Sequence, residues 1–257
     1  MKTEKEFEES IKKHLKELPK GYIESLKRDY KDDTMVIMHD LLPEDIKQSI
    51  ASEARQLLDK ESERRELIVE QSGGTPRSYN SVGRDIIRKE GVYIPAFFDS
   101  KEILNFLSTI IGEKIHKVPY APEEFIINSQ SKRGDTHGWH WDDYTFALIW
   151  VVDEPDILSG GRVEFVPRIK WDKEKTRIQL YETLKNDEVR SIHVPEGSCY
   201  LLRARDALHR ISPITKDTRR TVIVYTYATT EDLQDTSISH ESMESIYPKD
   251  TKKEALA

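Results

Sequence analysis

The sequence predicts an α+β protein in which an antiparallel β-sandwich or jelly roll is supported by helices from the N-terminal half. Two observations lead to this prediction. Apolar residues recur at helical spacing before residue 112, whereas short β-rich runs separated by Gly, Pro and Asp follow from Glu123 onward. The chain has 257 residues, of which 37% are hydrophobic, enough for one large core. We expect a single domain over residues 1–257, mainly helical over 1–120, with the jelly-roll core over 121–235.

The N-terminal half contains three expected helices. The first ends near Pro19, the second begins at Pro43, and the third runs from Asp99 to Gly112. The run MVIMHDLL between the first two predicts a short strand. Residues 71–83 (QSGGTPRSYNSVG) carry the glycine, proline and serine of an irregular loop. The strands of the second half are expected in the runs EEFIINSQ, FALIWVVD, RVEFVP, EVRSIHVP, SCYLLRA and RRTVIVYTYAT.

Composition excludes several classes of protein. A net charge of -7 without a basic stripe argues against nucleic-acid binding. The single cysteine, Cys199, excludes a disulfide framework and fits a reducing compartment. The N-terminal run MKTEKEFEESIKKHLKEL is too charged for a secretory signal, and no apolar run has membrane-spanning length. We therefore expect a cytoplasmic protein without nucleic-acid or membrane partners, and leave open whether it forms a homodimer.

Two histidines and an aspartate predict a metal centre. His140 and Asp142 are separated by one residue in the stretch HGWHWDDY. On a strand such residues point to the same face, so both can bind one ion. His209 follows a later β-rich run and supplies a third ligand from another strand. Two histidines and one carboxylate on one face of a metal are typical of non-haem Fe(II) oxygenases and leave positions open for substrate, cosubstrate and O2.

An arginine near the start of the last strand is the candidate partner of a cosubstrate carboxylate. A guanidinium group can hold the distal carboxylate of 2-oxoglutarate through two parallel hydrogen bonds. If Thr226 faces the interior, strand alternation puts Arg220 on the same side and Arg219 outside. Arg220 is therefore preferred, and Arg219 is the alternative if a bulge shifts the register.

Each of these features also has a simpler interpretation. A His-x-Asp pair recurs by chance, and an arginine pair before a strand is usually solvated. The remaining histidines, including His240 in a polar loop, are expected to be structural or solvated. The order of the motifs along the strands favours the metal centre. A zinc hydrolase is less favoured because the sequence has no HExxH motif.

The order His140-x-Asp142, Gly160-Gly161, His209 and Arg220 resembles the Fe(II)/2-oxoglutarate-dependent dioxygenases, whose core is a double-stranded β-helix. The stretch HGWHWDDYTFALIW looks like the small bacterial family that halogenates or hydroxylates free amino acids, notably L-lysine. The resemblance implies Fe(II), 2-oxoglutarate and O2 as cofactors, with ascorbate as an in vitro reductant.

The resemblance also implies roles for five further residues. Positions matching Arg77, Glu123, His137, Asp143 and Thr226 hold the amino-acid substrate in that family. A free lysine brings two ammonium groups and a carboxylate, which Asp143, Glu123 and Arg77 could neutralise. Arg77 lies in the expected 71–83 loop, which could close over the substrate. The family's C-terminal pocket tryptophan has no counterpart after His209, where Tyr247 or another residue could substitute.

Asp142 separates two reactions within the resemblance. In the halogenases of that family, glycine replaces the carboxylate ligand and leaves room for chloride on iron. Asp142 therefore implies return of hydroxyl rather than chlorine to the substrate radical. The expected function is hydroxylation of an unactivated C–H bond of a free cationic amino acid, with L-lysine as first candidate, giving hydroxylysine, succinate and CO2. The alternatives are halogenation of the same substrate and a non-catalytic jelly-roll module that binds a metal or ligand.

Overall fold

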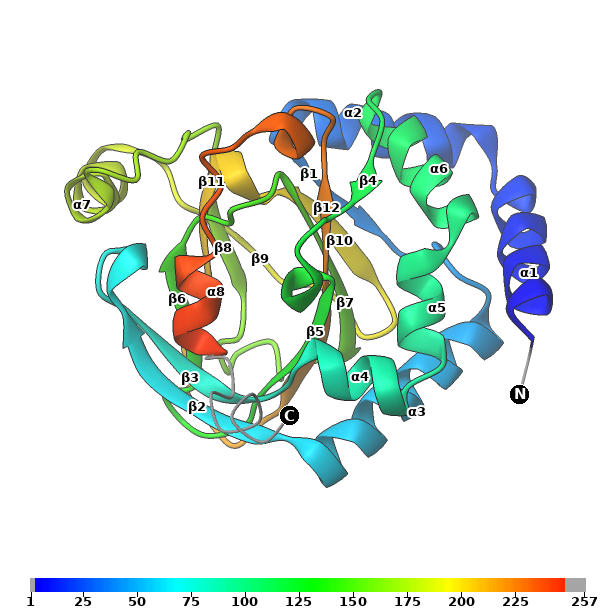
Figure 1. Cartoon of the computed structure of the whole chain (residues 1–257), viewed down its shortest axis with the longest axis horizontal. Helices are drawn as coiled ribbons and strands as arrows, with labels where there is room; N and C mark the ends of the chain where they lie inside the picture. Colours follow the sequence, from blue (N-terminus) through cyan, green and yellow to red (C-terminus); the bar gives the residue numbers. More distant parts are fainter. Residues whose placement is uncertain (1–2, 248–257) are drawn as a thin grey trace, which may run out of the picture.

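The computed structural model of the chain describes residues 3–247 (Figure 1). None of the helices within this part is long and apolar enough to span a bilayer. The helices are α1 (Glu4–Glu17), α2 (Lys20–Asp33), α3 (Glu44–Glu61), α4 (Arg84–Glu90), α5 (Tyr93–Asp99), α6 (Lys101–Ile111), α7 (Thr176–Asn186) and α8 (Glu241–Ile246). The strands are β1 (Met35–Met38), β2 (Glu63–Val69), β3 (Thr75–Val82), β4 (His116–Lys117), β5 (Phe125–Gln130), β6 (Thr136–His140), β7 (Phe146–Asp153), β8 (Val163–Pro167), β9 (Arg190–Ile192), β10 (Cys199–Arg203), β11 (Ala207–Ile211) and β12 (Arg220–Ala228).

All twelve strands belong to one antiparallel sheet that curls on itself. Its order is β1-β10-β7-β12-β5-β3-β6-β11-β8-β9, with β2 paired to β3 and β4 to β12. Strand β3 joins the two halves: β2 pairs along one edge of it, whereas β5 and β6 pair along the other edge, β6 at residues 77–78 and β5 at residues 80–82. Figure 1 shows the sheet curved around a central space, with α8 in front of it. The jelly-roll class expected from the sequence is confirmed.

Strand alternation separates a helix-covered face from an inner face. On β7, Leu148 and Trp150 pack among the helices, whereas Ala147 and Ile149 belong to the inner cluster. This assignment of alternate residues to opposite faces is what the period of two requires. The helix-side core also takes apolar residues from α1, α2, α3, α5 and α6. The helices therefore hold the larger half of the sheet rigid and leave its inner face for the cavity.

The three helices expected from periodicity are present as α1, α3 and α6. The first begins with a reciprocal capping box between Thr3 and Glu6. The third is capped by Ser100, whose hydroxyl accepts from the Ile103 amide at 3.2 Å. The strand expected in MVIMHDLL is β1, which adds to the edge of the sheet beside β10.

The prediction of an irregular loop over residues 71–83 is wrong. After a short 3-10 turn, residues 75–82 form β3 at the centre of the curled sheet. Its polar composition and Pro76 hid an alternating pattern in which Thr75, Arg77, Tyr79 and Ser81 are buried. Strand propensity reflects packing against neighbours more than composition, so tertiary pairing prevailed. Arg77 is therefore fixed on a central strand.

Candidate metal centre and its cavity

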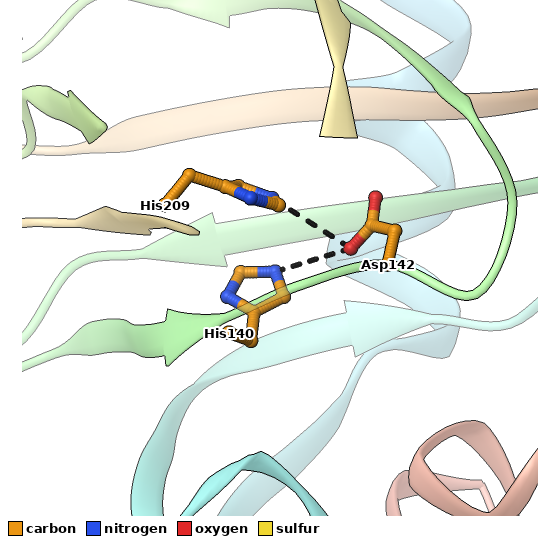
Figure 2. A group of neighbouring side chains, drawn as sticks. All are labelled: His140, Asp142 and His209. Atoms are coloured by element: carbon orange, nitrogen blue, oxygen red, sulfur yellow. Dashed lines mark ion pairs between the residues drawn. The ribbon is translucent and has the colours of Figure 1, made fainter. Parts of the chain in front are cut away.

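Three side chains with metal-binding atoms converge at one end of the curled sheet. Within residues 3–247, His140, Asp142 and His209 form a group whose candidate ligand atoms all lie within 4.8 Å of one another. Asp142 Oδ1 lies 3.4 Å from Nε2 of His140 and 3.6 Å from Nε2 of His209 (Figure 2). Two imidazoles and one carboxylate that meet at one point are the donor set of a facial triad, which fits Fe(II).

A β-bulge arranges the histidines. His209 on β11 pairs with His140, whereas Ile211 pairs with His137, so β6 advances three residues while β11 advances two. This extra residue brings both His137 and His140 into the cavity. Gly138 lies within the bulge, where a Cβ would come 2.8 Å from both Cδ and the carbonyl oxygen of Pro76. β6 ends at His140, so Asp142 lies just beyond the strand rather than on it.

Backbone carbonyls orient the two imidazole rings. Nδ1 of His140 lies 2.8 Å from the Gly138 oxygen, and Nδ1 of His209 lies 2.9 Å from the Ala207 oxygen. Each carbonyl accepts a hydrogen bond from Nδ1–H and so fixes the proton there. The lone pair of Nε2 is then free to bind a metal ion. Burial and nearby cationic groups lower the pKa of His140 well below its usual range. This ring is therefore neutral, as a metal ligand has to be.

Asp232 fixes the turn that carries Asp142. Its carboxylate accepts from the backbone amide of Thr145 at 3.0 Å and from the Thr145 hydroxyl at 2.9 Å. Arg205 donates to the same carboxylate at 2.7 Å. A buried charge with this many partners holds its neighbours in one geometry. No local pattern in the sequence indicates this role, since Asp232 is 87 residues from Thr145.

Arg220 lies in the cavity with no carboxylate of residues 3–247 at ion-pair distance. It is 4% exposed, and its guanidinium contacts Gln130 Oε1 at 3.3 Å and Tyr200 Oη at 3.5 Å. Burial lowers its pKa. Gly161 adjoins the Arg220 stem, where an added Cβ would lie 3.2 Å from Arg220 Cδ. The structure thus presents a desolvated cation whose natural complement is an anionic ligand.

Arg77 is a second buried guanidinium in the same cavity, and it too has no carboxylate of the described residues at ion-pair distance. It is 1% exposed and donates to Thr75 Oγ1 at 3.0 Å and Ser72 Oγ at 3.0 Å. Its Nε has no hydrogen-bond partner in the described part of the chain. Burial lowers the pKa of Arg77 to about 10. A second anionic group is therefore expected here.

Two carboxylates lie elsewhere in the cavity wall. Glu123, on the 3-10 turn Ala121–Glu123, is 9% exposed, and burial raises its pKa to about 7. Asp143 is 7% exposed, and burial raises its pKa as well. The negative charge of Asp142 raises both pKa values further, and that of Asp143 also raises the pKa of Glu123. This part of the cavity is suited to cationic groups.

The remaining predicted residues divide between the cavity and the surface. His137 lines the cavity and stacks on His140, with ring centroids 4.3 Å apart. Thr226 lines it as well and shares its face of β12 with Arg220, as strand alternation predicts. Arg219 is exposed and does not line the cavity. No observation here assigns a role to any of these side chains in a reaction, so those assignments stay predictions.

The structure also brings residues to the cavity or to its carboxylates for which the sequence analysis proposed no such contact. His240 is neither a metal ligand nor fully solvated: its Nδ1 lies 2.9 Å from Glu123 Oε1, and its ring stacks on Tyr120 at 3.6 Å. Lys173 Nζ donates to Asp143 Oδ1 at 2.6 Å. Met243 of α8 lines the cavity, together with Tyr247 just after that helix. A polar loop and a surface lysine carry no pattern that would have revealed these contacts.

Known proteins resemble the chain in sequence pattern and in fold. The model of the family described as Halogenase D matches residues 18–248. The non-heme α-ketoglutarate-dependent epimerase SnoN from nogalamycin biosynthesis is 15% identical with a TM-score of 0.60, over 82% of this chain and 84% of its own. SnoN has also been solved in complex with Fe3+, α-ketoglutarate and nogalamycin RO.

A prolyl-4-hydroxylase from Pseudomonas putida is 12% identical with a TM-score of 0.52, over 80% of this chain and 98% of its own. No curated protein sequence matches the chain. At these identities the solved structures establish the shared fold, and the reaction has to be argued from the site itself.

Proposed function

The chain belongs to the Halogenase D family, and from that premise we propose that it is an Fe(II)/2-oxoglutarate-dependent hydroxylase of a free cationic amino acid, with L-lysine as the first candidate. One observation carries the proposal furthest. The cavity beside the His–Asp–His group contains two buried guanidinium groups, of Arg77 and Arg220, that have no carboxylate partner among residues 3–247. Two separate anionic groups are needed to complement them.

Arg220 would hold 2-oxoglutarate. Its desolvated guanidinium can take the distal carboxylate through two hydrogen bonds, while Gln130 and Tyr200 keep the fork in place. His140, Asp142 and His209 would hold Fe(II) through Nε2, a carboxylate oxygen and Nε2. Bound Fe(II), with 2-oxoglutarate and O2, supplies the oxidant for an unactivated C–H bond, and 2-oxoglutarate leaves as succinate and CO2.

Arg77 would hold the substrate carboxylate, and Glu123 with Asp143 would hold its ammonium groups. The cavity wall contains a guanidinium and two carboxylates, the charges complementary to those of a diamino acid, which supports lysine over a neutral amino acid. His137 and Thr226 would contribute polar contacts to the same molecule. A substrate held in this way would have its reacting C–H bond buried beside the metal position, away from water.

Asp142 supports hydroxylation over halogenation. A carboxylate ligand at this position would occupy the coordination site that chloride needs, and Asp142 Oδ1 lies 3.4 Å and 3.6 Å from the Nε2 atoms of the two histidines. The name of the matching family keeps chlorination as the second candidate. A module that binds a metal without turnover is a third, but it leaves the need for two anions unexplained.

The test is an incubation of the purified protein with Fe(II), ascorbate and 2-oxoglutarate, with each amino acid supplied separately. We expect L-lysine to give succinate and a product heavier by one oxygen atom, detected by mass spectrometry. The same reaction in excess chloride distinguishes the second candidate by a chlorinated product. Iron binding without 2-oxoglutarate consumption across the whole panel would contradict both enzymatic proposals.

A further inference from the structure

Side chains of the chain itself already contact the two carboxylates of the cavity. Lys173 Nζ lies 2.6 Å from Asp143 Oδ1, and His240 Nδ1 lies 2.9 Å from Glu123 Oε1. Arg77 and Arg220 of the same cavity have no carboxylate partner among residues 3–247. An anionic ligand group therefore finds a guanidinium group without an ion-pair partner among the described residues. A substrate ammonium group instead finds a carboxylate that already contacts Lys173 or His240. This difference between the cations and the carboxylates is clearest at Asp143. Its partner is an ammonium group, the same functional group that a lysine substrate would bring.

Lys173 reaches Asp143 from the surface. It lies between β8 and α7, and its side chain is 37% exposed, against 6% for Asp143. Nζ lies 4.7 Å from the centre of the Trp171 ring and 3.4 Å from Ser239 Oγ. Lys173 is thus a long, half-solvated side chain whose charged end closes over a buried carboxylate. Such a side chain can leave for water without disturbing the core.

We propose that Lys173 is a specificity-determining gate, whose ammonium group occupies at Asp143 the position that an ammonium group of the substrate takes, so that substrate binding displaces it. The inference rests on the proposed function, because it needs a cationic substrate. Two ammonium groups at one buried carboxylate would repel each other at short range, where little water screens them. The substrate and Lys173 therefore exclude each other.

The gate gives the cavity a requirement that Asp143 alone would not impose. When Lys173 moves away, the buried carboxylate of Asp143 has no ion-pair partner at this point unless another cation replaces Lys173. A ligand that brings an ammonium group to this point restores the pair. A ligand that brings an apolar group there does not, so the open state is favoured only by a cationic substrate.

The first test measures the reactivity of the Lys173 amine. The full chain, loaded with Fe(II) and 2-oxoglutarate without oxygen, is treated briefly with an amine-acylating reagent, and acylation is read by peptide mass spectrometry. Added L-lysine also consumes the reagent, so an internal reference is needed. Lys175, which is exposed and lies two residues after Lys173, serves as that reference. We expect Lys173 to react several-fold more slowly than Lys175, and to approach it in Asp143→Asn or when L-lysine is added.

Two outcomes separate the gate from the proposed function. Turnover of L-lysine while Lys173 stays as protected as before would overturn the gate and leave the function standing. Absence of turnover with any amino acid would overturn the function, whatever the labelling of Lys173. Equal labelling of Lys173 in the wild type and in Asp143→Asn would also overturn the gate, since the pairing would not exist in solution.

The second test is kinetic and does not depend on the Asp143 variant. Lys173→Met retains a stem that can pack on Trp171 but removes the competing charge. We expect the KM for L-lysine to fall roughly 3- to 10-fold, as for the loss of a modest ion pair. Lys173→Arg keeps a cation and should keep the wild-type KM, and Lys175→Met is the matched control. A KM that rises in Lys173→Met, as for a residue that supports the site, would overturn the proposal.

Discussion

At the scale of single residues, the proposed choice of hydroxylation over halogenation depends on Asp142. Replacing it with glycine removes the carboxylate that lies 3.4 Å and 3.6 Å from the two imidazoles. We expect hydroxylation to fall on the order of 100-fold or more, since even partners outside the ligand set are worth 10–100-fold. In excess chloride, a chlorinated product should appear by mass spectrometry. An unchanged hydroxylation rate in Asp142→Gly would exclude Asp142 as a ligand.

Arg220 offers a second test at this scale. In Arg220→Met, the distal carboxylate of 2-oxoglutarate loses its buried partner, at a cost of about 2–5 kcal/mol. The Kd for 2-oxoglutarate should rise by roughly 30-fold or more, as measured by titration calorimetry without oxygen. Arg219→Met is the matched control, because Arg219 is exposed and should leave the Kd unchanged. Equal losses in the two variants would refute the assignment to Arg220.

Glu123 predicts a pH dependence of substrate binding. Burial raises its pKa from 4.5 to about 7, so the folded protein retains a proton there between these values that the unfolded chain releases. The stability from this proton is complete below about pH 4.5 and is lost as the pH rises through 7. The affinity for a cationic substrate changes with pH in the opposite direction to stability, because only the ionised Glu123 carboxylate attracts an ammonium group.

We therefore expect the affinity for L-lysine to rise up to about tenfold per pH unit below pH 7 and to level off above it. Titration calorimetry between pH 5.5 and 8.5 is the measurement. Glu123→Gln removes the group that titrates and should flatten the profile. A profile that keeps its slope in this variant would assign the dependence to the neighbouring His240 or Asp143.

At the scale of elements, the bulge in β6 is the feature that builds the metal centre. Gly138→Ala would place a Cβ 2.8 Å from Pro76 on the neighbouring β3, so the two strands have to separate. Overpacking of this kind costs about 1–3 kcal/mol and should also shift His137 and His140. We expect a lower Tm, measured by thermal unfolding, together with weaker metal binding, measured by Co(II) titration.

Gly21→Ala is the control for this element, because Gly21 lies in α2 and an added Cβ would meet nothing within 4 Å. Alanine favours a helix over glycine by about 1 kcal/mol, so the variant should be as stable as the wild type or slightly more so. Loss of stability without loss of metal affinity in Gly138→Ala would mean that the bulge does not position the histidines.

At the scale of the whole molecule, ligand binding should couple to stability. In the proposed function, Fe(II) and 2-oxoglutarate bind side chains that only the folded sheet brings together, so they would bind the folded state alone. At a hundredfold excess over Kd the gain is about 2.7 kcal/mol, or roughly 5–10 °C in Tm for a chain of this size. A chelator should reverse the shift, and His209→Ala should not show it. A shift that persists in His209→Ala would place the metal elsewhere.

The sequence by itself determined the fold class and the ordered set of candidate ligands. Apolar periodicity located α1, α3 and α6, and β-rich runs located most strands of the second half, because burial of alternating faces leaves a local signature. The candidate ligands His140, Asp142 and His209 were recognisable from their residue types and order, although Asp142 lies just beyond β6 rather than on it. Alternation along β12 predicted which of two adjacent arginines would face the cavity.

Only the tertiary structure decided where the polar groups meet. The strand over 75–82 looked like a loop, because its identity comes from pairing with β2, β5 and β6 rather than from its composition. The contacts of Lys173 with Asp143 and of His240 with Glu123 join residues 30 and 117 positions apart. Such contacts leave no local pattern, since a charged side chain finds its partner through the packing of whole elements. The charge balance of the cavity, and the gate that we propose from it, depend on the folded chain.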